Sequence, residues 1–565
     1  MQIKINGKGV KAKEGETILE VARRNKIYIP TLCYHPDLKP EGRCRVCLVE
    51  VNKKLVTSCN TKVEDKMEIF TNTKRVLEAR RLNLELLLSN VSYIRKDFEV
   101  AKLAKELGIR KIRFKKYVDI SKGRAPIEKD NHKCILCGRC VQVCQNIQKI
   151  NNIDFVNRGI FTEANTPFNI PLKYSPCTFC GQCALYCPEN ALRERAFNEK
   201  LVKYVENMDL VRDSKFFIVQ TAPSIRASLG EIFGMEPGTL VTGKMVSSLR
   251  KIGFDKVFDT DFGADLTIIE EANEFVERIK KNKNLPLITS CCPSWIKFAE
   301  DTYPFLLKNI STCKSPQQMF GAIAKTYYAK KIGVKPENLI VVSVMPCISK
   351  KFEAEKLEMR SAGCPDVDVV LTTRELGRII EKKKIKFAKL KDDEFDLPLG
   401  LSSGGGAIFG ATGGVTESAL RVAYELLTGE KLKKVDFKQI RGFEGIRDAT
   451  IKIKNRNIRV AIVHGLGNIR EMIESGKWKK YHFIEMMACP GGCIGGGGQP
   501  RPTTKEIRKK RMEALYRQDK NKEIRVASHN PAIKKIYKEF LGKPLGEKSK
   551  KLLHTKYKKR KPKYF

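Results

Sequence analysis

The pattern of hydrophobic and polar residues divides the chain into segments of different predicted structure. In residues 1–76, short stretches with β-like alternation, such as MQIKI and CRVCLVEV, flank one helix-like stretch, ETILEVARRN. Such a pattern predicts a compact α+β module. Residues 77–125 have a helical pattern and contain neither cysteine nor histidine, so they are predicted to form a spacer.

The rest of the chain changes from cysteine-rich to apolar. Residues 126–205 hold two cysteine runs that repeat at a fixed offset, which indicates a small duplicated domain. In residues 210–500, apolar stretches such as FFIVQTAP and LIVVSVMP alternate with helix-like stretches such as KMVSSLRKIGF, which is typical of a large α/β block with mostly parallel strands. Residues 501–565 are predicted to be a basic helical tail. We therefore expect a multidomain α/β protein.

Composition and charge narrow the class of protein. The 565 residues include 107 Lys and Arg against 64 Asp and Glu, a formal charge of +43. This charge either steers an acidic partner, such as a small ferredoxin, or is a lysine-rich background without a function. No nucleic-acid-reading motif accompanies the lysines, so no nucleic-acid partner is expected. No run approaches the ~18 apolar residues of a membrane span, so no span is expected.

Most of the 19 cysteines fall in short-spaced groups. Grouped cysteines indicate metal ligation rather than disulfides. The first residues, MQIKINGKGV, lack the apolar stretch of a secretory signal. Because thiolate ligands need a reducing compartment, we expect a cytoplasmic location.

Two runs share the spacing C-x2-C-x2-C-x3-C, and they consist of Cys134, Cys137, Cys140 and Cys144, then Cys177, Cys180, Cys183 and Cys187. Thiolates at this spacing wrap a 4Fe-4S cubane, and in two-cluster ferredoxins the fourth cysteine of each run ligates the other cluster. One cluster would then be held by Cys134, Cys137, Cys140 and Cys187, and the second by Cys177, Cys180, Cys183 and Cys144. Zinc is the alternative, but a zinc site would be expected to stop at four sulfurs.

Another cysteine group lies in the α+β module and consists of Cys33, Cys44, Cys47 and Cys59. Its spacing is looser than that of plant-type 2Fe-2S ferredoxins, so on spacing alone a structural zinc ion is an alternative. The phrase GRCRVCLVEV resembles the 2Fe-2S domain at the front of complex-I-type and hydrogenase subunits. This resemblance favours a 2Fe-2S cluster in a β-grasp module.

Three loops in the α/β block carry the remaining grouped cysteines. They are TSCCP at 289–293, MPCISKKFE at 345–353 and MMACPGGCIGGGG at 486–498. Together they resemble the signature loops of iron-only (FeFe) hydrogenases. The resemblance covers almost the whole chain, with residues 501–565 in the place of a small-subunit-like segment, and implies a catalytic domain that holds an active-site cluster, the H-cluster.

The resemblance assigns residues to this cluster. It implies that Cys292, Cys347, Cys489 and Cys493 ligate a cubane, with Cys493 bridging to a diiron unit that bears CO, CN and azadithiolate ligands. Ser224, Gln317 and Lys350 would donate hydrogen bonds to the cyanides. The apolar wall of the cluster pocket would be formed by Ala222, Pro223, Met345, Phe409 and Met487. Glu353 would contribute a carboxylate to the same pocket. For each apolar residue alone, ordinary core packing is the alternative.

A proton route is implied in the same way. Cys291 would pass protons to and from the open iron, which suits a thiol because its ordinary pKa is near 8.5. Glu271, Glu274 and Arg278 share one face of a predicted helix, and with Ser311 they match the family's route to the surface. A solvated amphipathic face is the alternative. Cys313 and Cys364 have no ligand role in the pattern.

The sequence departs from the longest family members in one respect. Those proteins carry a further cubane, held by one His and three Cys, in the segment that corresponds to 77–125, and this chain has no such ligand there. We therefore expect one 2Fe-2S cluster, two 4Fe-4S clusters and the H-cluster, about 16 irons in all.

The implied function is the reversible reaction of two protons and two electrons to give H2, with electrons relayed through the iron-sulfur clusters. Expected partners are ferredoxin or companion NAD(P)H-oxidising flavoprotein subunits, and the maturation proteins that install the diiron unit. A non-catalytic role in iron-sulfur assembly or sensing is an alternative, although Cys291, Lys350 and Glu353 would have no purpose in it. A pure electron-transfer subunit would explain residues 1–200 but not the three cysteine loops.

Overall fold

The computed structural model describes residues 1–91, 98–114, 125–195, 199–206 and 215–560. These residues fall into two compact units that do not follow chain order. The first contains Met1–Asn146, Asn151–Ser175 and Tyr186–Arg193, and the second contains Ile147–Ile150, Pro176–Leu185 and Glu194–Phe565. Two short pieces from the middle of the predicted cubane domain therefore belong to the large carboxyl-terminal unit.

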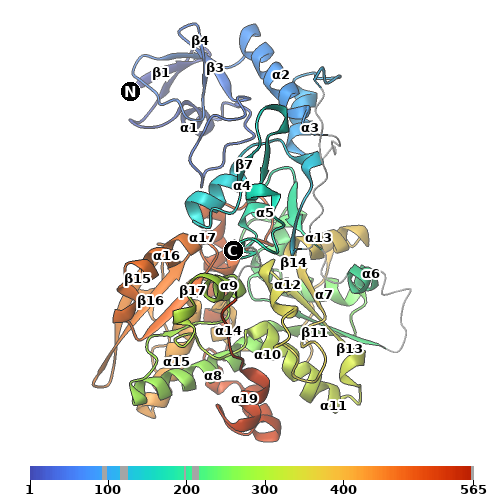
Figure 1. Cartoon of the computed structure of the whole chain (residues 1–565), viewed down its shortest axis with the longest axis vertical. Coiled ribbons are helices and arrows are strands. Elements are labelled where there is room, and N and C mark those ends of the chain that lie inside the picture. Colours follow the sequence, from blue (N-terminus) through green and yellow to red (C-terminus); the bar gives the residue numbers. More distant parts are fainter. Residues whose placement is uncertain (92–97, 115–124, 196–198, 207–214, 561–565) are drawn as a thin grey trace. The chain divides into compact units, whose positions relative to one another are not determined.

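The first unit begins with a five-stranded mixed sheet in the order β2-β1-β5-β3-β4 (Figure 1). Its elements are β1 (Gln2–Ile5), β2 (Lys8–Lys11), α1 (Ile18–Arg24), β3 (Leu48–Val51), β4 (Lys54–Thr57) and β5 (Glu68–Phe70). Helix α1 starts at a capping box formed by Thr17 and Glu20, and its apolar side chains complete the core of the module. This is the α+β architecture that the alternation in the sequence predicts.

The spacer segment and the first cubane segment complete this unit. The spacer contains α2 (Lys74–Leu88) and α3 (Glu99–Glu106), while residues 92–97 and 115–124 lie outside the described part of the chain. The cubane segment has little regular structure, as expected. Its elements are β6 (Ile127–Lys129), α4 (Arg139–Gln142), the hairpin of β7 (Asp154–Val156) and β8 (Glu163–Asn165), and the start of β9 (Leu192–Glu194).

The second unit is built on two four-stranded sheets (Figure 1). One has the order β11-β10-β13-β14, all parallel, and consists of β10 (Phe216–Thr221), β11 (Lys256–Asp259), β13 (Leu339–Met345) and β14 (Val369–Thr372). The other has the order β12-β17-β16-β15, with only the edge strand β15 antiparallel, and consists of β12 (Leu287–Ile288), β15 (Ile446–Ile453), β16 (Arg456–His464) and β17 (Phe483–Met487). The α/β class is thus confirmed.

Burial explains why these strands were visible in the sequence. Every residue of β13 and β17 is buried, because helices cover both faces of a parallel sheet. The helices of this block are α6 (Glu199–Glu206), α7 (Thr242–Ile252), α8 (Thr260–Lys281), α9 (Pro293–Thr302), α10 (Pro316–Ile323), α11 (Ala329–Lys331), α12 (Ser349–Ala354), α13 (Thr373–Lys382), α14 (Gly404–Ile408), α15 (Gly414–Thr428) and α16 (Leu466–Glu474). Among the described residues, no helix combines the length and apolar character needed to cross a bilayer.

The carboxyl-terminal segment is helical and is anchored to α8. It contains α17 (Lys505–Asn521), α18 (Pro531–Ile536) and α19 (Glu547–Leu553). The buried carboxylate of Glu270 on α8 accepts hydrogen bonds from the Tyr537 and Ser549 hydroxyls and from the Leu545 backbone N–H. One carboxylate on the central helix therefore fixes the course of the tail.

Helices α8 and α10 pack at a distance that only glycine permits. A Cβ on Gly263 would lie 2.3 Å from the carbonyl oxygen of Pro316. We expect Gly263→Ala to push the two helices apart and to destabilise the unit by about 1–3 kcal/mol, the usual cost of overpacking. A lower thermal midpoint, followed by circular dichroism, would show this effect. Gly9→Ala is the control, since no heavy atom lies within 4 Å of its Cβ position; equal midpoints for both variants would contradict the packing argument.

Candidate active site

The cysteine loops of the second unit lie where parallel strands end. Cys291 and Cys292 follow β12, Cys347 follows β13, and Cys489 follows β17. The carboxyl ends of parallel strands are the usual place for sites in α/β folds. The fold thus brings loops that are far apart in sequence into one site.

The four predicted ligand cysteines lie close together; Cys347 and Cys489 are buried, and Cys292 and Cys493 are partly buried. Burial, together with a smaller effect of the neighbouring Cys292, raises the pKa of the Cys347 thiol to about 12. Burial also raises the pKa of Cys493, with additional contributions from Cys292 and Cys347. The same holds for Cys489, whose pKa is raised by burial and then by Cys347 and Cys292. Thiols whose ionisation is opposed mainly by burial, and for three of them by neighbouring thiols as well, fit a cationic metal cluster, which holds thiolates deprotonated.

Local backbone supports such a cluster. Cys292 is the N-cap of α9, and Cys347 lies just before α12, so both sulfurs are near the positive ends of helix dipoles. The Cys292 sulfur also accepts the backbone N–H of Ala488 at 3.4 Å. Gly492 has φ of +90°, and a Cβ there would lie 2.8 Å from the Met487 sulfur, so the loop before Cys493 requires glycine.

One residue of the predicted pocket, Ser224, has a buried hydroxyl that lacks a hydrogen-bond partner among the described residues. A buried hydroxyl without a partner is costly, so its presence fits a bound group that accepts its hydrogen. The other predicted wall residues are likewise buried, namely Ala222, Pro223, Met345, Phe409 and Met487.

Lys350 and Gln317 meet at one carboxylate. The Lys350 ammonium donates to the Cys291 carbonyl at 3.1 Å and to Glu353 at 2.9 Å. Gln317 Nε2 and the Ser315 hydroxyl also donate to Glu353, at 3.2 and 2.9 Å. Although burial opposes its charge, Glu353 raises the pKa of Lys350, so the ammonium form is retained. Two of the three ammonium hydrogens are engaged, which leaves one for a bound group.

The predicted proton route forms a connected series on and beside α8. Glu271 is buried, and burial raises its pKa to about 8, with Ser311 lowering it and Glu274 raising it. The Ser311 hydroxyl donates to Glu274 Oε2 at 3.1 Å. Arg278 donates to Glu274 Oε1 at 2.6 Å. Glu271 in turn raises the pKa of Cys291, after the larger effect of burial. Ser311 therefore joins Glu271 to Glu274, and Glu271 lies near enough to Cys291 to raise its pKa.

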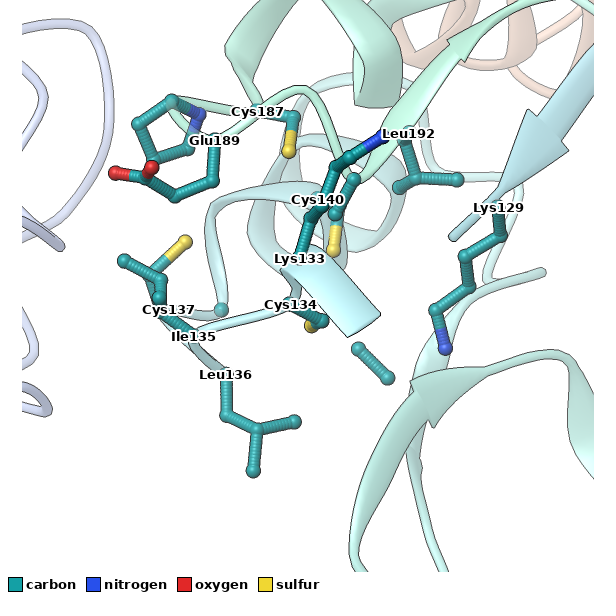
Figure 2. Close-up of a pocket in the computed structure, with 14 residues that line it drawn as sticks. Lys129, Lys133, Cys134, Ile135, Leu136, Cys137, Cys140, Cys187, Glu189 and Leu192 are labelled. Atoms are coloured by element: carbon teal, nitrogen blue, oxygen red, sulfur yellow. The ribbon is translucent and has the colours of Figure 1, made fainter. Parts of the chain in front are cut away.

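The first cubane ligand set lines one pocket of the first unit. Figure 2 shows the sulfurs of Cys134, Cys137, Cys140 and Cys187 around this pocket, with Lys129 and Lys133 at its edge. This is the set that the two-run pattern assigns to one cubane. Of the second set, Cys144 belongs to the first unit, and Cys177, Cys180 and Cys183 belong to the second.

The cysteines of the amino-terminal module form another buried group. Cys33, Cys44, Cys47 and Cys59 are all buried. Hydrogen bonds from Cys44 and Cys59 lower the pKa of Cys33, while the bond with Cys33 raises that of Cys44. Thiols in direct contact with one another fit a bound cluster.

The segment 176–185 links the ferredoxin-type cysteines to the active-site loops within the second unit. Gln182 Nε2 donates to the Gly495 carbonyl at 2.9 Å, and the Ser349 hydroxyl donates to the Thr178 carbonyl at 3.3 Å. Cys180 is near enough to Cys489 to raise its pKa. The sequence analysis did not predict a role for Gln182 or Ser349. Their position next to cluster cysteines is the sequence feature that could have pointed to them.

Comparison with known proteins agrees with this geometry. The family profile described as "Iron only hydrogenase large subunit, C-terminal domain" matches residues 215–497, and "Iron hydrogenase small subunit" matches 505–560. A "2Fe-2S iron-sulfur cluster binding domain" matches residues 1–74, and a "4Fe-4S dicluster domain" matches 133–191.

Named relatives extend over the full chain. The chain is 48% identical over 592 residues to the NADP-reducing hydrogenase subunit HndD of Solidesulfovibrio fructosivorans, covering 99% of both chains. It is 42% identical to iron hydrogenase 1 of Clostridium pasteurianum, covering 98% of this chain and 99% of that protein. The structure of an apo FeFe-hydrogenase from Chlamydomonas reinhardtii aligns with a TM-score of 0.57 and 39% identity, over 64% of this chain and 98% of that one. The chain therefore belongs to the iron-only (FeFe) hydrogenase family.

Proposed function

We propose that the chain catalyses the reversible reaction 2 H⁺ + 2 e⁻ ⇌ H2. The observation that carries this proposal is the presence, in one unit, of four buried or partly buried ligand cysteines beside Cys291, Glu271, Ser311 and Glu274. Ligand thiols alone would serve electron transfer or cluster assembly. A series of buried groups that can exchange protons, next to the ligand thiols, is needed only if the bound cluster catalyses a reaction of protons.

Cys292, Cys347, Cys489 and Cys493 would hold the H-cluster. When bound, this cluster supplies open low-valent iron, with CO, CN and azadithiolate ligands, where H2 is made and split. Ser224 and Lys350 would each direct a hydrogen-bond donor toward its cyanides, and Gln317 would do so once its amide leaves its contacts with Glu353 and the Lys350 carbonyl. Apolar side chains would keep water from the cluster, and the two methionines would add polarizable sulfur to the pocket. These residues are Ala222, Pro223, Met345, Phe409 and Met487. Glu353 fixes Lys350 through the 2.9 Å ion pair.

Protons move along residues of this chain. Cys291 exchanges a proton with the reacting centre, and Glu271 receives or returns it. Ser311 passes the proton between Glu271 and Glu274, since a hydroxyl can donate and accept at once. Arg278 holds Glu274 in place through the hydrogen bond to Oε1.

Electrons would enter through the other clusters. We propose a β-grasp 2Fe-2S domain over residues 1–76, a spacer without a cluster over 77–125, a two-cubane domain over 126–205, the catalytic domain over 210–500 and a small-subunit-like segment over 501–565. The donor or acceptor would be ferredoxin or an NAD(P)H-oxidising flavoprotein subunit, as the name of the NADP-reducing relative suggests. Maturation proteins would install the diiron unit, and an anaerobic cytoplasm would keep the thiolates reduced.

The primary test is hydrogen evolution from reduced methyl viologen under strict anaerobiosis. The protein should first contain about 16 irons per chain, from one 2Fe-2S, two 4Fe-4S and one six-iron cluster. Rapid evolution by such protein is the expected result. No evolution despite verified insertion of the diiron unit would overturn the proposal and favour a role in iron-sulfur assembly or sensing.

Cys291→Ser should keep the clusters but lower turnover at least about 10²-fold, because a hydroxyl is a far weaker acid than a thiol. Iron content and the infrared bands of CO and CN check assembly, and hydrogen evolution checks turnover. Cys364→Ser, in a loop outside the site, is the matched control and should retain full activity. Unchanged turnover in Cys291→Ser would remove this thiol from the route.

Glu271→Gln should lower turnover by a similar factor, about 10²-fold, because an amide carries no exchangeable acid proton. Burial holds the pKa of Glu271 at about 8, so the carboxyl keeps its proton at neutral pH and loses it above this value. Hydrogen evolution by the parent enzyme should therefore fall as pH rises through this pKa, and hydrogen oxidation should fall as pH drops below it. Rate profiles in both directions measure this dependence.

The control for this prediction is Glu277→Gln, on the exposed side of the same helix, where Glu277 pairs with Lys281. It should change neither rate nor pH profile. A Glu271→Gln enzyme with the parent profile would show that the proton bypasses this carboxyl.

A further inference from the structure

The carboxyl-terminal segment packs directly on the loop that carries Ser311. The Lys314 N–H donates to the Leu553 carbonyl at 2.8 Å, and the Thr555 N–H donates to the Thr312 carbonyl at 2.8 Å. The Tyr557 hydroxyl donates to the Cys313 carbonyl at 3.1 Å. These bonds fix the residue between Leu553 and Thr555, which is His554, beside Thr312.

Side chains continue from Glu274 to this histidine without a break. The Thr312 hydroxyl lies 3.2 Å from Glu274 Oε2 and 2.8 Å from His554 Nδ1. His554 Nε2 lies 3.1 Å from Glu270 Oε2. Thr312 is an exposed residue, and 7% of the His554 side chain is accessible, so the series reaches the surface.

Arg278 cannot serve as this outer end. Its guanidinium donates to Glu274 and to the backbone carbonyls of Asn284, Asn309 and Ile310. Arginine is not deprotonated in proteins, so it can orient Glu274 but cannot pass a proton on. Oxygen Oε2 of Glu274, which Arg278 leaves free, is the one that faces both Ser311 and Thr312.

We propose that Thr312 and His554 form the outer end of the proton route, with His554 as the group that exchanges protons with solvent. This inference rests on the proposed hydrogenase function. Imidazole suits the position because one ring nitrogen can accept a proton while the other stays hydrogen-bonded.

The transfer balances in the direction of hydrogen evolution. Charged His554 donates from Nδ1 to the Thr312 oxygen and from Nε2 to Glu270, while the Thr312 hydroxyl donates to ionised Glu274. The Nδ1–H bond breaks as a new O–H bond forms on Thr312, and the old Thr312 O–H bond breaks as Glu274 Oε2 gains the proton. After this step His554 and Glu274 are both neutral, and the Thr312 hydroxyl hydrogen points toward His554 instead of Glu274. Solvent then returns a proton to Nδ1, and hydrogen oxidation runs the same steps backward.

Glu270 keeps the imidazole in the orientation that this transfer needs. Burial raises the pKa of Glu270, but hydrogen bonds from His554, Ser549 and Tyr537 outweigh burial and leave it below its ordinary value. The ionised carboxylate thus retains the Nε2 hydrogen and leaves Nδ1 to exchange. The titratable groups that face His554 are Glu270 and Glu274 on α8, the Cys313 thiol of the adjoining loop, and the Tyr537 phenol of the tail.

The test replaces His554 in the fully loaded enzyme and adds a mobile base. His554→Ala should lower hydrogen evolution about tenfold or more above neutral pH, where protons are scarce, and free imidazole should restore much of the rate. His529→Ala is the matched control, because His529 is also a tail histidine paired with a carboxylate, Glu425, at 2.9 Å. It should show neither the loss nor the rescue.

Two further variants separate proton transfer from structure. His554→Gln can still donate a hydrogen bond but cannot carry a proton, so it should lose activity like His554→Ala if the histidine is a relay and retain activity if it only anchors the tail. Thr312→Val should lose activity, while Thr312→Ser, which keeps the hydroxyl, should retain it.

An infrared titration of the carboxyl C=O band, without turnover, gives an independent readout. In His554→Gln, protonation of Glu274 should slow or shift with pH relative to the parent. An active parent enzyme with unaltered rates, pH profile and carboxyl band in both His554 variants would overturn the relay and leave the hydrogenase function intact. An inactive, fully loaded parent would instead overturn the function itself.

Discussion

Four thiols are held close together at the ends of parallel strands, two of them buried and two partly buried, and the catalytic unit is organised around the cost of ionising them there. Burial raises the pKa values of Cys347 and Cys493, and the neighbouring thiols raise them as well. Only a bound cation removes that cost. The protein contributes helix amino termini at Cys292 and Cys347 and the backbone N–H of Ala488, all of which favour negative charge on sulfur.

Burial also favours proton transfer through side chains. Glu271 and Ser311 are buried, so each step between them needs a group that can donate or accept a proton. Ser311 and Glu274 provide such a step at 3.1 Å, and the guanidinium of Arg278 keeps the carboxylate from turning away. Helix α8 can present its carboxylates here because Gly263 lets it approach α10 closely. The close packing of α8 on α10 thus helps to position the carboxylates of the proton route.

Sequence reasoning succeeded where a local pattern carries the information. Strand β13 is visible as an apolar run because both its faces are buried, and the cysteine spacings around Cys134 and Cys177 are fixed by cluster geometry. The contact of His554 with Thr312 could not be predicted, since it joins residues far apart in the chain and depends on the anchoring of the tail at Glu270. The three hydrogen bonds that converge on Glu353 were missed for the same reason.

The division into compact units has a consequence for electron supply. Residues 176–185 belong by sequence to the second cubane run, yet they pack within the catalytic unit, where Gln182 bonds the Gly495 carbonyl at 2.9 Å. Gly181 also approaches Gly497 so closely that a Cβ would lie 3.1 Å from its Cα. Electron transfer slows steeply with distance, so a cluster ligand loop gains from being part of the rigid body that holds the final acceptor. Cys180 therefore keeps a constant relation to Cys489 within that unit, whatever partner delivers the electron to the clusters further out.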